Sequence, residues 1–85
     1  MSRLVRIYRS TRRQEMYLFV DAGEDLERVP EGLLKGFGQP VQAMELELDA
    51  QRKLARADAA AVLERIESEG FYLQMPPPLE ADHGR

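Results

Sequence analysis

The chain has 85 residues, of which 44% are hydrophobic and 32% are charged, and its formal net charge is −3. This composition is typical of one small soluble domain and argues against a disordered or membrane protein. The absence of cysteine excludes disulfides, thiolate metal sites and cysteine nucleophiles. The single histidine, His83, lies in the last few residues, so we expect neither histidine-based catalysis nor a histidine metal site.

The charge of the chain is unevenly distributed. Residues 1–13 carry five arginines and no acid, whereas residues 14–85 carry seven basic and fifteen acidic residues. We therefore expect no general attraction to nucleic acid, although the arginine-rich end could bind an anion locally. No apolar run approaches the ~20 residues that span a bilayer, and Arg6 and Arg9 interrupt any signal-peptide core. These features predict a cytoplasmic protein.

The first half of the chain predicts a hairpin followed by a helix. Residues 4–8 and 16–21 are rich in β-forming side chains, and the polar segment 9–15 is expected to connect them. Apolar residues then recur at helical spacing until Gly38, which is a strong stop signal. We therefore predict a short helix over residues 30–37.

The second half predicts a strand, a helix and a final strand. Residues 41–49 are predicted to form a strand with one buried face, because apolar and acidic side chains alternate over residues 44–49. An apolar stripe predicts a helix over residues 59–69, with Asp58 as its N-terminal cap and Gly70 in the left-handed position at its end. Residues 71–75 form the last predicted strand.

The order β-β-α-β-α-β predicts an α+β fold. We expect two helices to be too few to cover both faces of a four-stranded sheet. We therefore expect a two-layer sandwich, with a small, mostly antiparallel or mixed sheet and both helices on one face. Residues 1–78 would form the single domain, and residues 79–85 a flexible tail. The predicted common core comprises Val5, Ile7, Leu18, Val20, Leu33, Met44, Leu46, Leu48, Val62, Leu63, Ile66 and Leu73.

Several segments of the chain are distinctive in their exact residues. They are Tyr8–Ser10 with Glu15–Val20, Arg28–Leu34 with Phe37–Pro40, Arg52–Asp58, and Gly70–Pro77. Together these segments resemble the YcgL domain, a family of gamma-proteobacterial proteins, over residues 4–78. The resemblance implies a small α/β fold and supplies no catalytic, metal or cofactor residues that could be carried over to this chain.

One candidate interaction surface follows from strand alternation. If the helices cover one face of the sheet, the opposite face would carry Arg6, Tyr8, Tyr17, Phe19 and Tyr72. Exposed aromatic residues beside arginine suit a protein or self interface, and they can also stack unpaired RNA bases. The alternative that we favour over both is cross-strand aromatic pairing that only stabilises the sheet. Glu45 and Glu47, expected on the same face, argue against a phosphate backbone.

A second candidate is the first turn, which contains Arg9, Arg12 and Arg13. These arginines could clamp a phosphate or carboxylate. A solvated polar turn is the favoured alternative, because exposed arginines of this kind are common.

The sequence therefore favours a non-enzymatic interaction module whose partner is a protein of unknown identity. The alternative is a small RNA-associated factor that uses the arginines and the aromatic residues, although RNA is disfavoured. We expect no catalytic residues, no cofactor, no metal and no membrane partner. An enzyme is the least favoured class, because Ser10, Thr11 and Ser68 have no expected histidine partner.

Overall fold

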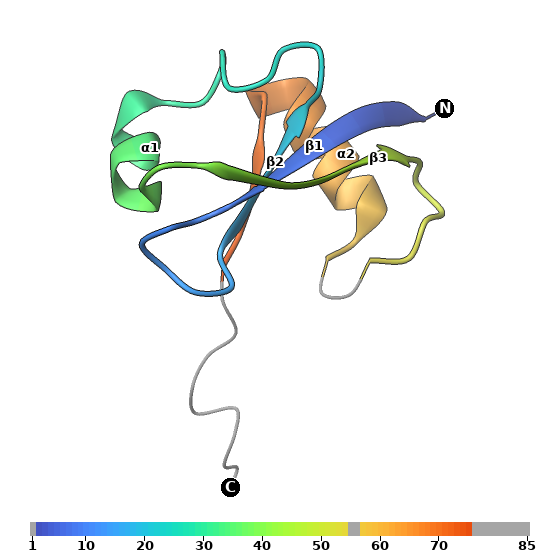
Figure 1. Cartoon of the computed structure of the whole chain (residues 1–85). Coiled ribbons are helices and arrows are strands. Elements are labelled where there is room, and N and C mark those ends of the chain that lie inside the picture. Colours follow the sequence, from blue (N-terminus) through green and yellow to red (C-terminus); the bar gives the residue numbers. More distant parts are fainter. Residues whose placement is uncertain (1, 55–56, 76–85) are drawn as a thin grey trace, which may run out of the picture.

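The computed structural model describes residues 2–54 and 57–75 of the chain. The elements follow one another in the predicted order β-β-α-β-α-β (Figure 1). They are β1 (Arg3–Arg9), β2 (Tyr17–Asp21), α1 (Glu31–Phe37), β3 (Val41–Leu48), α2 (Ala59–Glu69) and β4 (Tyr72–Gln74). The predicted tail, residues 79–85, lies outside the described part of the chain.

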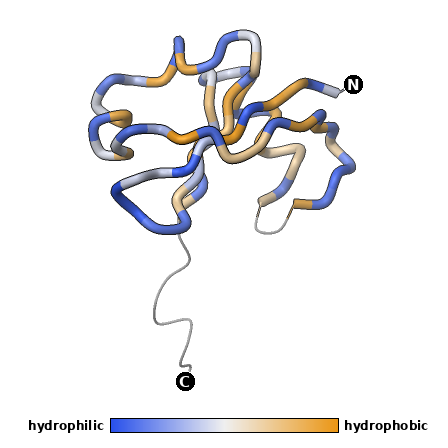
Figure 2. Tube along the Cα trace, in the orientation of Figure 1, coloured by the Kyte–Doolittle hydropathy of each residue, from blue (hydrophilic) through white to orange (hydrophobic). Residues whose placement is uncertain are grey.

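The four strands form one sheet in the order β3-β1-β2-β4, and every neighbouring pair is antiparallel. The α+β class is therefore confirmed, and the sheet is antiparallel rather than mixed. The polar turn of residues 10–15 folds β1 and β2 back on each other as a hairpin, and this hairpin is central because β3 pairs with β1 and β4 pairs with β2. Figure 2 shows this turn as a hydrophilic loop at one end of the sheet.

The two helices lie on opposite faces of the sheet, so the prediction of both helices on one face was wrong (Figure 1). The register pairs Ile7 with Phe19, and their side chains share the face that α2 covers. The register also pairs Tyr8 with Leu18, and these side chains share the face that α1 covers. β2 is apolar at successive positions because each of its faces contributes to a separate core.

The hydrophobic interior is accordingly divided into two clusters. Val5, Ile7 and Leu48 pack with α2 residues on one face, and Leu18, Val20 and Phe37 are buried on the other. The prediction of one common core was wrong in this respect, because alternate residues of the central strands point into different clusters. The predicted core residues that are only partly buried are Leu33, Leu46, Leu63 and Leu73, and Met44 is 52% exposed.

The ends of α2 confirm one half of the capping prediction. Gly70 has φ of 92° and donates its backbone N–H to the carbonyl of Ile66, as expected for a left-handed ending. A Cβ at Gly70 would lie 2.4 Å from the Cβ of Arg28, so close packing also requires glycine there. Asp58 occupies the N-cap position in an extended conformation, but its side chain makes no capping hydrogen bond. The expected Asp58 side-chain cap was therefore wrong.

Candidate functional site

The five side chains expected on one open face lie on two covered faces. Tyr17, Phe19 and Tyr72 point to the α2 face, whereas Arg6 and Tyr8 point to the α1 face. The premise of a single exposed aromatic face was therefore wrong. It failed because the two-sided apolar character of β2 reflects two cores rather than an uncovered surface.

The aromatic residues of this group are largely packed inside the protein. Phe19 is 5% exposed, and its ring meets that of Tyr72 edge to face, with ring centroids 5.7 Å apart. Tyr8 is 9% exposed, and Tyr17 is partly buried against the α2-side core. Cross-strand pairs of this type contribute roughly 0.2–1 kcal/mol each. This packing is in keeping with the alternative that the aromatic residues only stabilise the sheet.

Arg6 is held in a network of ionic contacts on the α1 face. Its Nη2 lies 2.8 Å from Oε2 of Glu45, and its Nη1 lies 3.2 Å from Oδ1 of Asp25. The Tyr8 hydroxyl donates a hydrogen bond of 2.5 Å to the same oxygen of Asp25. The hydrogen bond to Glu45 is the main cause that raises the pKa of Arg6. The pKa of Tyr8 is raised mainly by burial, and secondly by the hydrogen bond to Asp25. Arg6 is therefore already paired with acids of its own chain.

The basic turn is attached to the rest of the fold through hydrogen bonds of Ser10. The Ser10 hydroxyl oxygen accepts hydrogen bonds from the backbone N–H groups of Arg12 and Arg13, at 3.0 and 2.9 Å. The same hydroxyl donates to the carbonyl of Phe37, and Ser10 is only 7% exposed. A serine at the start of a polar turn is the sequence signal of such a motif, and the prediction of a solvated turn overlooked it.

The close packing of this turn also explains Gly38. Gly38 has φ of 85°, and a Cβ there would lie 2.6 Å from Oγ1 of Thr11.

The three arginines of the turn remain on the surface. Arg9, Arg12 and Arg13 are exposed, and no ion pair among the described residues involves them.

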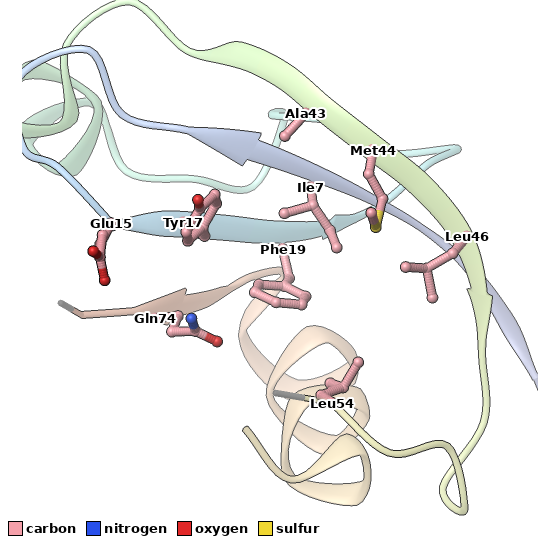
Figure 3. Close-up of a pocket in the computed structure, with 9 residues that line it drawn as sticks. All are labelled: Ile7, Glu15, Tyr17, Phe19, Ala43, Met44, Leu46, Leu54 and Gln74. Carbon is pink, nitrogen blue, oxygen red and sulfur yellow. The ribbon is translucent and has the colours of Figure 1, made fainter. Parts of the chain in front are cut away.

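An apolar groove opens on the α2 face beside β3 (Figure 3). α2 packs over β2 and β4 and leaves the Met44 end of β3 uncovered. The groove has a volume of about 630 Å³, which is within the range of ligand-binding clefts. It is lined by Ile7, Glu15, Tyr17, Phe19, Ala43, Met44, Leu46, Leu54 and Gln74. Sequence reasoning missed it because the alternation of β3 predicted that Met44 would be buried.

The backbone of β3 has one open side along this groove. The Ala22 N–H donates to the Leu4 carbonyl at 2.9 Å, so Leu4 directs its backbone groups toward β2. Backbone direction alternates along an antiparallel strand, and Val5 and Ile7 therefore direct theirs toward β3. The β3 residues opposite them are Leu46 and Met44, whose backbone groups are therefore directed toward β1.

It follows that Glu45 and Glu47 direct their backbone N–H and C=O groups away from β1. β3 is an edge strand of the sheet, and no other described strand pairs with this side. The groove and the open edge are thus adjacent: the side chains of Met44 and Leu46 line the groove, and the residues after them present free hydrogen-bonding groups.

Other kinds of site find little support among residues 2–54 and 57–75. No group of three or more His, Asp or Glu side chains in this part of the chain is placed to hold a metal ion. No helix in it is long and apolar enough to cross a membrane.

Comparison with known proteins places the chain among close relatives. The family model described as "YcgL domain" matches residues 5–77. A YcgL domain-containing protein of Pseudomonas entomophila is 58% identical over 78 residues, covering 92% of this chain and 80% of the relative. A YcgL domain-containing protein of Cronobacter sakazakii is 53% identical over 74 residues, covering 87% of this chain and 81% of the relative. These names indicate no enzyme family.

Proposed function

This chain belongs to the YcgL domain family, and we propose that it is a non-enzymatic, cytoplasmic module that binds an extended segment of a protein partner along β3. The observation that carries the proposal is the adjacency of an open edge strand and an apolar groove. An added strand would gain backbone hydrogen bonds from the edge, and its side chains could enter the groove beside it.

The length and composition of β3 support this role. β3 has eight residues, whereas β4 at the other edge of the sheet has three. Proteins commonly shorten, bend or cover edge strands to prevent unwanted pairing. β3 is long enough for several backbone hydrogen bonds, and the 52% exposed side chain of Met44 lies at its groove side. Methionine adapts its shape to different apolar partners, which suits a binding surface.

Anion or RNA binding is a second candidate, supported by the exposed Arg9, Arg12 and Arg13. It has less support because base stacking requires accessible rings, and Tyr8 and Phe19 are buried on opposite faces. The two candidates differ in salt dependence. Binding through phosphates weakens strongly as salt increases, whereas binding through backbone hydrogen bonds and apolar contacts weakens much less.

The proposal is tested with a random library of eight-residue peptides, matched to the length of β3. Peptides selected on the native protein should bind a Met44→Asp variant about tenfold more weakly or worse, because a buried charge would replace an apolar contact. Met75→Asp is the matched control, since Met75 is 54% exposed and lines a different cleft beside α1. The proposal would be contradicted if the selected peptides bound the Met44→Asp variant as tightly as the native protein, or if they lost binding to the Met75→Asp variant. Thermal melting of both variants verifies that they fold.

A further inference from the structure

We propose that the bound segment alternates cationic and apolar residues, with its cationic side chains opposite Glu45 and Glu47. This inference rests on the proposed function and specifies the chemistry of the partner at the same site. It follows from two properties of β3: the direction of its backbone groups and the face on which its acids lie.

The first property fixes which residues of the added strand form hydrogen-bonded pairs. Glu45 and Glu47 direct their backbone groups to the open edge, because Met44 and Leu46 are paired with β1. The two residues of an added antiparallel strand that face Glu45 and Glu47 would therefore exchange both hydrogen bonds with them. These two partner residues are separated by one residue.

The second property fixes what those residues should be. Directly opposite residues share a face of the sheet, with Cβ atoms about 4.5–5.5 Å apart. The Glu45 and Glu47 side chains are both exposed on the α1 face, and Arg6 pairs with Glu45. The Glu47 carboxylate instead accepts a 3.5 Å hydrogen bond from the Ser2 hydroxyl. Glu47 therefore offers the stronger attraction for a cation.

The residue between the two cations would point to the opposite face, beside the groove. There it lies opposite Leu46 and continues the row formed by Val5 and Leu46, which are cross-strand partners. A side chain at that position would pack against Leu46 at the apolar groove, and the next residue on this face, opposite Met44, would cover that exposed side chain, so both should be aliphatic or aromatic.

The same acids argue against a second copy of this chain as the occupant. If two copies paired antiparallel along the acidic half of β3, Glu45 would lie opposite Glu45 or Glu47 of the second copy. Like charges directly opposite each other destabilise a strand pair. Charge on an exposed edge strand is a common device against self-association. The acids would thus exclude self-pairing and admit a basic segment.

The test compares three eight-residue probe peptides: alternating valine and lysine, alternating valine and threonine, and alternating valine and glutamate. From the usual strength of two cross-strand ion pairs, the lysine peptide should bind about 2- to 30-fold more tightly than the threonine peptide. The glutamate peptide should bind most weakly. Equal or tighter binding of the threonine or glutamate peptide would overturn the inference and leave the proposed function intact. Binding of none of the three at any accessible concentration would overturn both.

A charge reversal separates this effect from general attraction. Glu47→Lys should reverse the preference, so that the glutamate peptide binds more tightly than the lysine peptide. Glu64→Lys makes the same change of net charge on the exposed side of α2 and should leave the preference unchanged. A preference that shifts equally in both variants would refute pairing with Glu47.

Backbone methylation tests the geometry. Methylation of the lysine amides should abolish binding, because those N–H groups face β3, whereas methylation of the valine amides should be tolerated. The opposite pattern would contradict the proposed register.

Discussion

Replacement of Ser10 by alanine tests how the basic turn is attached to the sheet. The Ser10 hydroxyl donates to the Phe37 carbonyl and accepts from two backbone N–H groups of the turn. Ser10 is 7% exposed, so Ser10→Ala would leave the carbonyl without this partner in a place that water hardly reaches. An unsatisfied buried polar group costs about 1–3 kcal/mol. The turn N–H groups are only partly buried and can reach water, so they should add little.

This loss would be a large share of the total stability, which for 85 residues should be roughly 4–13 kcal/mol. The assay is chemical denaturation followed by circular dichroism. Thr11→Ala is the matched control, because its hydroxyl makes one exposed hydrogen bond of 3.1 Å to the Gln39 carbonyl. We expect a loss below about 0.5 kcal/mol for Thr11→Ala. Equal losses for the two variants would refute the assigned role of Ser10.

Three further predictions concern packing, the backbone and pH. Gly70→Ala should destabilise the protein by at least about 1–2 kcal/mol, because the φ of Gly70 is 92°. Gly36→Ala should instead stabilise the protein by about 0.4–1 kcal/mol, because a Cβ at Gly36 would lie in open space. Denaturant melts that place the two variants in the opposite order would contradict this prediction. Ile66→Ala should cost about 2–5 kcal/mol and the partly buried Leu63→Ala distinctly less, which the same melts measure. Burial, and after it the hydrogen bond to Asp25, raises the pKa of Tyr8 above 10.0. The contribution of Tyr8 to the free energy of unfolding is therefore complete below pH 10.0, and it declines as the pH rises through the pKa of Tyr8 in the folded protein. An ultraviolet titration should show a late tyrosinate that Tyr8→Phe removes, and its persistence in that variant would assign it elsewhere.

Local patterns in the sequence predicted the elements of the fold well. The helix over residues 59–69 was predicted with the bounds that the structure has, because an apolar stripe and Gly70 agree on where it ends. The positive φ of Gly70 was also predicted, since glycine alone adopts it without strain. Both features depend on residues that lie within a few positions of each other in the sequence, so local patterns are sufficient to predict them.

The arrangement of layers was not predicted, because it depends on contacts between distant segments. β2 is apolar on both faces, and this pattern is equally compatible with a recognition surface and with two cores. Only the position of α1 against Leu18 decides between them. The groove was missed for a similar reason: α2 covers Leu48 and not Met44, and nothing in the alternation of β3 distinguishes the two positions.

Amide hydrogen exchange along β3 tests the central claim most directly. In the free protein, the amides of Glu45 and Glu47 should exchange rapidly because they face the open edge, whereas those of Met44 and Leu46 should be protected by β1. Addition of the valine–lysine peptide should protect Glu45 and Glu47 and leave the turn of residues 10–15 unchanged. Protection of that turn with continued rapid exchange at Glu45 and Glu47 would contradict binding along β3.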